Sequence, residues 1–237
     1  MINICEIFQS IQGEGKYLGT PSIFVRTSGC NLRCQWGDTK CDTPYSSWDP
    51  EQNLMPIADI MARVMELVDE HSHIHHFVIT GGEPLLQPKL NDFLKTLKET
   101  VENAHITIET NGTIYAELTA DFLSISPKLS SSVPRNSEFE AMHEKSRLNF
   151  DALQSWLDQY DCQFKFVVDR EDDGKEIHDI LKGLKKVNDE QIYLMPQGIN
   201  QQQLDEHTKT CIELANDYGW RYTPRKHIEL YGLQRGT

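Results

Sequence analysis

Residues 29–43 follow a strand-like run and read Gly29-Cys30-Asn31-Leu32-Arg33-Cys34-Gln35-Trp36-Gly37-Asp38-Thr39-Lys40-Cys41-Asp42-Thr43. This stretch holds three cysteines, an odd number that lies too close together in sequence for a ladder of disulfides. Cysteine thiolates are the usual ligands of iron–sulfur clusters. Three thiolates on one loop suit a four-iron cubane whose fourth iron stays open to a ligand. The stretch therefore predicts a site-differentiated iron–sulfur cluster.

A structural zinc site is the alternative for the same cysteines. Zinc usually binds two closely spaced cysteine pairs, or one such pair with histidines. This chain offers one pair, Cys30 and Cys34, and the single Cys41, so a histidine would have to complete the site. The run His71-Ser72-His73-Ile74-His75-His76 could supply it, although such a run is typical of a polar link between a helix and a strand.

The composition predicts a cytoplasmic protein that handles small molecules. The chain has 237 residues and a net charge of −13, which disfavours a nucleic-acid partner because phosphate binding needs basic surface. Residues 1–5 show no signal-peptide pattern, and no apolar stretch is long enough to span a membrane. We therefore expect a reducing compartment, where thiols serve metals or catalysis. The isolated Cys5, Cys162 and Cys211 are interpreted as buried bystanders.

Helix-like and strand-like segments alternate along the chain. Helices are expected at 56–70, 88–100, 150–160, 175–187 and 204–218. Strands are expected at 23–26, 77–80, 106–109, 122–125, 164–168, 192–195 and 220–222. This alternation indicates a parallel sheet with right-handed crossovers. We expect a single α/β domain over residues 1–237, a partial TIM-like barrel of about six parallel strands with outer helices.

Glycines and polar residues follow the predicted strands. Ligands bind at the carboxyl ends of strands in parallel sheets and barrels, so these loops are expected to converge on one face. They are Ser28-Gly29, Thr80-Gly81-Gly82-Glu83, Glu109-Thr110-Asn111-Gly112, Ser126-Pro127-Lys128 and Pro196-Gln197-Gly198. The paired glycines of the second loop let backbone approach a ligand closely, and Glu83 could accept a hydrogen bond from an ammonium group. Residues 129–146 are polar and non-periodic, which predicts a mobile loop or an excursion.

Several motifs together resemble a known enzyme family. The cysteine loop and the Gly81-Gly82-Glu83-Pro84 run are similar to those of radical S-adenosylmethionine enzymes. Within that superfamily the chain resembles the 7-carboxy-7-deazaguanine synthases, specifically up to residue 128 and loosely beyond it. The motifs that carry the resemblance are Phe8-Gln9-Ser10-Ile11-Gln12-Gly13-Glu14-Gly15, Phe24-Val25-Arg26-Thr27-Ser28-Gly29-Cys30-Asn31-Leu32, Cys41-Asp42-Thr43-Pro44-Tyr45, Val78-Ile79-Thr80-Gly81-Gly82-Glu83-Pro84 and Ser124-Ile125-Ser126-Pro127-Lys128.

The resemblance implies a lyase that uses radical chemistry. That family converts 6-carboxy-5,6,7,8-tetrahydropterin to 7-carboxy-7-deazaguanine and releases ammonia, on the way to queuosine-type nucleosides. Its implied cofactors are a 4Fe-4S cluster, S-adenosylmethionine and Mg²⁺. An electron from the cluster cleaves S-adenosylmethionine, and the resulting radical takes a hydrogen atom from the pterin, while the protein positions the reactants and excludes water. The implied partners are the pterin substrate, an electron donor such as flavodoxin or ferredoxin, and a second copy in a homodimer.

The resemblance also implies which residues serve each ligand. Cys30, Cys34 and Cys41 would hold the cluster, and Thr43 would bind Mg²⁺. The substrate-binding residues would be Ile11, Gln12, Gly13, Arg26 and Thr80, with Arg26 as a bidentate clamp on the carboxylate. The S-adenosylmethionine contacts would be Lys40, Cys41, Asp42, Gly82, Glu109, Asn111, Ser126, Pro127, Lys128, Met195, Pro196, Gln197 and Gly198. Plain structural interpretations stay open: a turn at 11–13 and an ion pair for Arg26. No catalytic residue is assigned beyond these ligands.

The cysteine spacing departs from the family pattern. That pattern is usually C-x₃-C-x₂-C, whereas this chain has C-x₃-C-x₆-C with Gly37 at the usual third position. In one register, residues 37–40 are an insertion and Cys41 is the third ligand. In the other, Gly37 replaces a ligand, so the cluster lacks its third cysteine and does not function normally. We favour the insertion because it retains three thiolates and because residues 41–45 match the family better, although Asp38 and Thr39 remain a rival pair near the metal.

Other interpretations stay open from the sequence. A glycyl-radical-activating enzyme shares the cysteine loop and the run from Gly81 to Leu86, but the Gln12-Gly13-Glu14-Gly15 segment and Thr43 argue against it. A non-catalytic module stabilised by zinc is the alternative from another class. Some family members end in a proline near the substrate; here Arg225 and His227 follow the last strand and either line the substrate end or belong to a surface tail.

Overall fold

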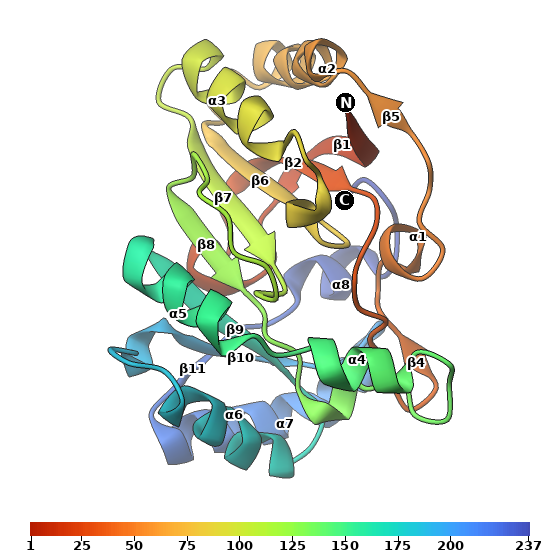
Figure 1. Cartoon of the computed structure of the whole chain (residues 1–237), viewed down its shortest axis with the longest axis vertical. Coiled ribbons are helices and arrows are strands. Elements are labelled where there is room, and N and C mark those ends of the chain that lie inside the picture. The colour runs from red at the N-terminus through yellow and green to blue at the C-terminus, as the bar shows by residue number, and fades with distance from the viewer.

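One nine-stranded sheet runs through the protein (Figure 1). The computed structural model describes residues 1–237. The strand order is β11-β10-β9-β8-β7-β6-β2-β1-β5, and each neighbouring pair from β2 to β11 is parallel. The predicted α/β class, with a parallel sheet that forms an open partial barrel, is confirmed. The strands are β1 (Ile2–Ile11), β2 (Pro21–Thr27), β5 (Leu54–Met55), β6 (His76–Gly81), β7 (His105–Thr110), β8 (Phe122–Ile125), β9 (Cys162–Val168), β10 (Ile192–Pro196) and β11 (Arg221–Tyr222).

Strand β1 is absent from the strands that the sequence predicts. It pairs antiparallel with both β2 and β5 at one side of the sheet. Ile2 and Ile4 are buried in the main hydrophobic core, and Ile7 packs against it, whereas Phe8 packs with Phe24 and Val78 in a separate buried cluster. A bulge between Ile4 and Glu6 shifts the register and brings Glu6 opposite Arg26 on β2.

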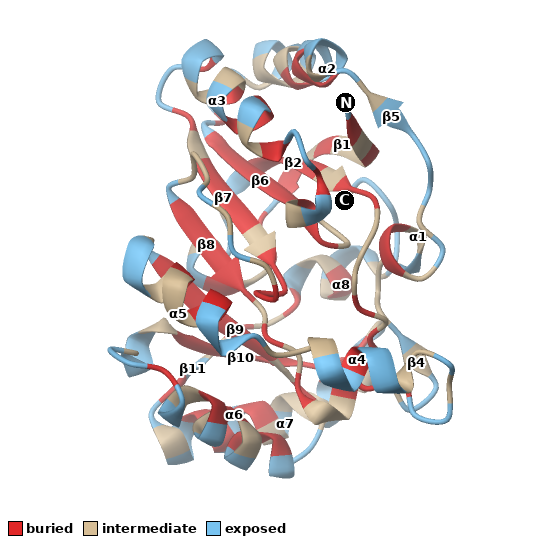
Figure 2. Ribbon diagram, viewed as in Figure 1, coloured by how far each residue is buried: buried red, intermediate tan, exposed pale blue.

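Helices pack against the sheet with their apolar faces, as Figure 2 shows by their red inner and pale blue outer sides. In α2 the buried residues are Ile60, Met61 and Val64, at helical spacing. All five predicted helices are present, with ends within a few residues of the prediction except that α6 begins and ends earlier. None of the helices combines the length and the apolar character that crossing a membrane requires. The helices are α1 (Pro44–Ser47), α2 (Ile57–Glu70), α3 (Leu90–Thr100), α4 (Glu140–Ser146), α5 (Phe150–Gln159), α6 (Asp172–Lys182), α7 (Gln201–Tyr218) and α8 (Lys226–Tyr231).

Residues 129–146 leave the sheet as an excursion, as predicted, but they are not a plain loop. They contain a short 3-10 helix, η3 (Ser130–Ser132), and the helix α4. His143 on α4 has no exposed surface. The sequence offers no apolar periodicity here because the buried positions are few and irregularly spaced, and two of them, Ser132 and His143, are polar.

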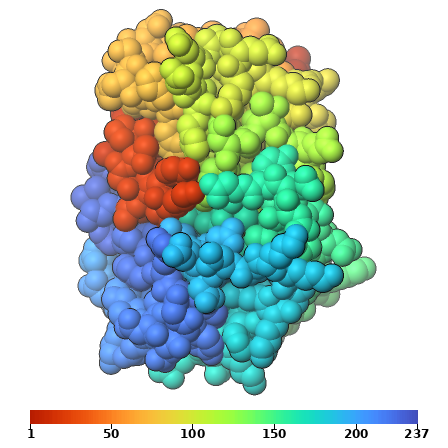
Figure 3. Space-filling model, turned by 90° about the vertical axis from the view of Figure 1, so that its left-hand side faces the viewer, coloured from red at the N-terminus to blue at the C-terminus, as the bar shows by residue number.

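The segment after β1 crosses to the C-terminal half of the protein. It contains the 3-10 helix η1 (Gly15–Tyr17), and in Figure 3 the red-orange N-terminal segment lies between the orange and yellow upper part and the blue lower part. The Gly15 N–H donates to Thr223 Oγ1 at 2.7 Å, and the Lys226 N–H donates to the Gly13 carbonyl at 3.0 Å. These bonds bring residues 12–15 beside the segment that follows β11.

Candidate active site

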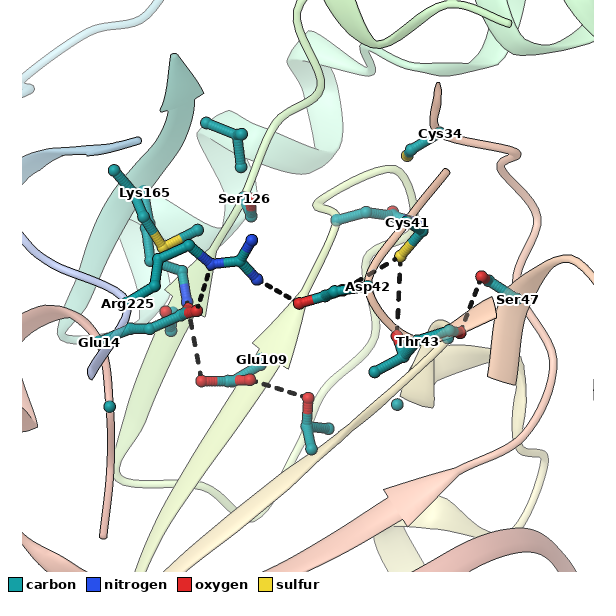
Figure 4. A pocket seen from close by; sticks show the side chains of 18 of the residues that line it. Glu14, Cys34, Cys41, Asp42, Thr43, Ser47, Glu109, Ser126, Lys165 and Arg225 are labelled. Atoms are coloured by element: carbon teal, nitrogen blue, oxygen red, sulfur yellow. Dashed lines mark hydrogen bonds and ion pairs between the residues drawn. The ribbon is translucent and has the colours of Figure 1, made fainter. Parts of the chain in front are cut away.

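A single cavity at the carboxyl ends of the parallel strands gathers most of the predicted site residues (Figure 4). Because β2, β6, β7, β8, β9 and β10 point the same way, the loops that follow them meet at one edge. The predicted residues that line the cavity are Ile11, Gln12, Gly13, Arg26, Cys30, Cys34, Lys40, Cys41, Asp42, Thr43, Thr80, Gly82, Glu109, Asn111, Ser126, Lys128, Met195 and Gln197. Pro127, Pro196 and Gly198 are not among the lining residues.

The three loop cysteines form one end of this cavity, which we call the thiol end (Cys30, Cys34 and Cys41). Cys34 is buried and the other two are half-buried. Burial raises the pKa of Cys30 to about 11 and the pKa of Cys34 well above its usual value. The Leu32 N–H donates to Cys30 Sγ at 3.4 Å. The thiols are therefore neutral in the ligand-free protein, and a positive metal centre would be needed to hold them as thiolates.

Residues 35–40 fold as a β-hairpin, which explains how the long cysteine spacing closes. Strand β3 (Gln35–Trp36) pairs with β4 (Thr39–Lys40), and Gly37 at the turn has a positive φ of 54°. This conformation suits glycine and is typical of a two-residue hairpin turn. The Cys41 N–H donates to the Cys34 carbonyl at 3.1 Å, directly below the paired strands. The hairpin thus returns the chain to Cys34, so Cys41 lines the cavity and Gly37 does not.

The Gly-Gly-Glu-Pro loop is packed tightly under the cysteine loop. A Cβ atom on Gly82 would lie 2.2 Å from the Gly29 carbonyl oxygen and 2.4 Å from that of Ser46, so only glycine fits. Glu83 has no exposed surface. Its carboxylate accepts from the Asn111 N–H at 2.7 Å and from Thr110 Oγ1 at 2.9 Å. The expectation that Glu83 faces a ligand is wrong: it joins this loop to the one after β7 from below.

Opposite the thiols lies a cluster of paired charges that we call the charged end. Arg225 donates to Glu14 at 3.2 Å through Nε, pairs with Asp42 through its terminal nitrogen, and reaches the Gly198 carbonyl at 2.7 Å. Lys165 pairs with Glu14 and lies 3.8 Å from Glu109. Arg225 therefore ties three loops together: the one after β1, the cysteine loop and the one after β10. The charged end consists of Glu14, Asp42, Glu109, Lys165 and Arg225.

The pairing at the charged end overrides the cost of burying ions. Burial alone raises the pKa of Glu14, but Lys165, Arg225 and His227 outweigh it and lower that pKa below its usual range. Asp42 behaves alike, because Arg225 lowers a pKa that burial would raise. The pKa of Lys165 is lowered by burial and raised by more through Glu14. These groups are therefore ionised together, and each depends on its partners.

Arg26 is both an ion pair and a cavity residue. Its Nε donates to Glu6 Oε1 at 2.6 Å, which is the plain structural interpretation left open from the sequence. Glu6 also accepts from the Tyr45 hydroxyl at 2.9 Å. The pair fixes one edge of the guanidinium while Arg26 still lines the cavity, beside the Phe8 ring at 5.6 Å. The ring of Phe8 stacks on Phe24 at 5.1 Å and 7°, and this aromatic pair lines the cavity.

The loops after β7 and β8 supply the middle of the cavity. Glu109 accepts from Gln12 Nε2 at 3.2 Å and from Thr80 Oγ1 at 2.8 Å, so it lies with the residues predicted for the substrate. Asn111 Nδ2 donates to Asn31 Oδ1 at 2.8 Å. Lys128 Nζ donates to the carbonyl and hydroxyl of Ser126 at 2.7 and 2.8 Å.

Sequence reasoning missed two members of the charged end. Lys165 lies in the middle of the apolar strand β9. Glu14 directly follows the predicted substrate residues 11–13, but no role of its own was predicted for it. A lone charge inside a buried parallel strand is itself a signal, because lysine is almost never buried without a partner. Arg225 and His227 line the cavity, as does Thr237, so the surface-tail interpretation is wrong for these positions.

The structure gives no support to a zinc site. No three histidine, cysteine, aspartate or glutamate side chains are gathered to hold a single ion. None of the histidines between 71 and 76 lines the cavity, and His76 is held by Ser22 and Thr107 at 2.7 and 2.8 Å. Zinc requires its ligands to converge on one point. A cubane cluster binds each cysteine through a different iron, so thiols spread along one wall fit it.

Comparison with known proteins gives a consistent result. The model of the Radical SAM superfamily matches residues 24–211. A 7-carboxy-7-deazaguanine synthase of Halobacterium salinarum is 41% identical, over 96% of this chain and 90% of that protein. One from Rhodopirellula baltica is 39% identical, over 99% of this chain and 88% of that protein. The crystal structure of QueE from Escherichia coli shares the fold, with a TM-score of 0.69 and 24% identity over 95% of this chain and 94% of that one.

Proposed function

The chain belongs to the 7-carboxy-7-deazaguanine synthase family of the radical SAM superfamily, and from this premise we propose its reaction. It converts 6-carboxy-5,6,7,8-tetrahydropterin to 7-carboxy-7-deazaguanine with release of ammonia, as a lyase in queuosine-type biosynthesis. The observation that carries the proposal is the single cavity that joins the thiol end to Gln12, Arg26 and Thr80. The relatives do not favour a glycyl-radical-activating enzyme or a zinc-stabilised module.

The donor set fits a 4Fe-4S cluster with S-adenosylmethionine on its open iron. Cys30, Cys34 and Cys41 would be the ligands, and the hairpin at 35–40 supports Cys41 over position 37 as the third. When bound, the cluster would supply the electron for reductive cleavage of S-adenosylmethionine, the source of the radical chemistry. Gly82 lines the cavity and would offer its backbone to the methionine end.

The protein's own contribution is to hold the pterin flat and aligned. The stacked Phe8 and Phe24 offer an apolar wall to a planar ring. Arg26 would bind the substrate carboxylate with its terminal nitrogens while Glu6 holds its Nε. The substrate set is Ile11, Gln12, Gly13, Arg26 and Thr80.

The remaining lining residues are assigned to S-adenosylmethionine. Asn111 and Glu109 would hold its ribose, with Glu109 at the border to the pterin because Gln12 and Thr80 both donate to it. The other lining residues in this proposal are Lys40, Cys41, Asp42, Gly82, Ser126, Lys128, Met195 and Gln197, while Pro127, Pro196 and Gly198 belong to the same loops without lining the cavity. The loops that follow β8 and β10 would support the adenosyl group.

Thr43 is the proposed magnesium residue. Its carbonyl accepts from the Ser46 and Ser47 hydroxyls at 2.9 and 3.0 Å, which hold the residue at the start of α1. Its own hydroxyl stays on the cavity side, 3.6 Å from Cys41 Sγ. A neutral hydroxyl suits Mg²⁺, which favours oxygen and keeps several waters. The ion would orient the substrate.

The same proposal includes the protein's context. Residues 1–237 form one domain, and the chain works as a homodimer with a flavodoxin- or ferredoxin-type electron donor. It is cytoplasmic, because six unpaired cysteines and an oxygen-sensitive cluster suit a reducing compartment.

The test is a defined anaerobic reaction. Protein reconstituted with iron and sulfide should convert 6-carboxytetrahydropterin to 7-carboxy-7-deazaguanine when given a reductant, S-adenosylmethionine and Mg²⁺. Thr43→Ala should lower turnover while it spares the cluster and the cleavage of S-adenosylmethionine. Product is measured by chromatography with mass detection, beside 5′-deoxyadenosine.

Two outcomes would overturn the proposal. If S-adenosylmethionine is cleaved but no deazaguanine forms, and a glycyl-radical protein becomes activated, the chain is an activating enzyme. If the protein purified without air holds zinc and no sulfide, the thiol end is a structural metal site.

A further inference from the structure

The excursion at residues 129–146 packs directly on the cysteine loop. Phe139 and His143, four residues apart, face this loop from α4 and the residue that precedes it. The Phe139 ring lies 5.5 Å from the Arg33 guanidinium and meets the Trp48 ring edge-on at 5.6 Å. Figure 1 shows α4 beside β4. These contacts make the excursion a support of the segment between two cluster ligands.

Both ring nitrogens of His143 are engaged, and their partners fix its tautomer. The Arg33 N–H donates to Nδ1 at 3.1 Å, so Nδ1 is the acceptor. The Ser132 hydroxyl donates to the Leu129 carbonyl at 2.7 Å, which leaves its oxygen to accept from Nε2–H at 3.3 Å. His143 thus links the backbone of the cysteine loop to η3 through one neutral imidazole with no exposed surface.

Other side chains take up three carbonyls of the segment from Cys30 to Cys34. The Arg33 guanidinium donates to the carbonyls of Cys30 and Leu32 at 2.8 and 2.9 Å. Trp48 Nε1 donates to the Cys34 carbonyl at 3.0 Å. The bond to His143 takes up the Arg33 N–H, and a buried N–H without an acceptor is costly.

We propose that His143 is a positioning residue that holds the cysteine loop in its cluster-binding shape through the Arg33 N–H. The proposal rests on the assignment of Cys30 and Cys34 as cluster ligands. His143 touches neither substrate nor cofactor; it acts by keeping the turn between the ligands from opening when the cluster is absent or oxidised. A loop that stays closed rebinds iron quickly and loses it slowly, because less ordering is needed at each binding event.

Two amide variants separate the two bonds of His143. In His143→Asn the side-chain oxygen can stand where Nδ1 stands and accept from Arg33, while the link to Ser132 is lost. In His143→Gln the longer side chain reaches the Ser132 side, and the Arg33 N–H loses its acceptor. The full chain is examined with and without its cluster by hydrogen exchange over residues 30–36 and by the rate of iron loss to a chelator.

The expected results differ for the two variants. His143→Gln should speed exchange at the Arg33 amide and iron loss by about tenfold, since an unpaired buried N–H shifts such an equilibrium by about that factor. His143→Asn should stay within about threefold of the unaltered protein in both. Equal behaviour of the two variants would overturn the proposal, because it would mean that His143 only fills space.

His76→Gln is the matched control. His76 is also buried between two hydroxyls, those of Ser22 and Thr107, but lies at the amino ends of the strands. It should lower overall stability without a change in exchange at 30–36 or in iron loss. If it speeds iron loss as much as His143→Gln does, the effect is global and the proposal fails. Failure of the proposed function is distinct: the unaltered protein would then bind no iron and sulfide, while the exchange of the cluster-free chain still tests His143.

Discussion

The two ends of the cavity are built in opposite ways (Figure 4). The thiol end comes from one short stretch of chain, and backbone hydrogen bonds and a hairpin hold it. The charged end draws its members from five separate places in the sequence, and ion pairs between side chains hold it. A motif can specify the first kind of site because its parts move together. The second kind exists only when the whole sheet is assembled.

The difference also separates their physical states. Burial at the thiol end raises the pKa values of the thiols and leaves them neutral until a metal binds. At the charged end the ions are formed already and satisfy one another. The thiols would therefore have to lose protons when a metal binds, whereas the groups of the charged end are held ionised by one another. Changes at the two ends should accordingly show up in different measurements.

The largest expected effect is at the thiol end. Cys41→Ala should abolish the cluster, as should Cys30→Ala and Cys34→Ala, because three thiolates are the full set on this wall. Gly37→Ala should keep it and only strain the hairpin turn, where φ is 54°. Iron and sulfide analysis after anaerobic reconstitution measures both. Full iron and sulfide in Cys41→Ala would show that the hairpin does not deliver the third ligand.

Arg225→Leu tests whether the charged end is structural by itself. Removing one partner of a buried ion pair typically costs about 3–5 kcal/mol, because the remaining charges stay buried and unpaired. We expect a loss of that size in the free energy of unfolding, measured by urea denaturation of the cluster-free chain. Arg221→Leu is the control, since this exposed arginine pairs with Glu190 at 3.5 Å and should change stability by less than about 1 kcal/mol. A small loss in Arg225→Leu would contradict the comparison between the ends.

Arg26→Ala tests whether Arg26 binds the substrate or serves only a structural role. If its terminal nitrogens clamp the substrate carboxylate, the variant should weaken binding of the carboxylated pterin by about 2–5 kcal/mol and leave S-adenosylmethionine nearly unchanged. Equilibrium binding of each ligand to the reconstituted protein gives the two values. If the variant weakens binding of both ligands equally, or of neither, Arg26 serves only as the structural ion pair with Glu6.

The smallest effect concerns acid pH at the thiol end. Burial, with Lys128 and Arg147 nearby, lowers the pKa of His143 to about 4, against about 6.5 in an unfolded chain. Above pH 6.5 the imidazole is neutral in both the folded and the unfolded state, so it does not lower the free energy of unfolding. As the pH falls from 6.5 toward 4, the unfolded state takes up the proton first, and the free energy of unfolding decreases. His143 should therefore lower the free energy of unfolding by about 1 kcal/mol when the pH falls from 7 to 5.5.

Urea denaturation at the two pH values measures this loss. His143→Asn should remove the part of this pH-dependent loss that His143 causes. His76 has a pKa lowered to about 4 for the same reason of burial, so His76→Asn should remove a similar share elsewhere. A pH response that is unchanged in His143→Asn would sink this prediction.

The periodicity of apolar residues predicted most of the helices and strands, and the elements that were missed are those without it. The helices and the parallel strands were predictable because apolar residues recur at helical spacing or in short runs, as in α2 and β6. Strand β1 was missed because Glu6 interrupts its alternation at a bulge. The helix α4 was missed because its buried face is His143 and not an apolar residue.

By itself the sequence determined that three thiols lie on one loop after a strand, that glycines follow the next strand, and that the loops of a parallel sheet share an edge. These are consequences of chain direction and spacing, and they hold before any packing is known. Only the tertiary structure decided that Glu14, Lys165 and Arg225 meet, that Glu83 is turned away from the cavity, and that α4 supports the cysteine loop. Such contacts join residues far apart in the chain, so their free energy appears only when the sheet has brought them together.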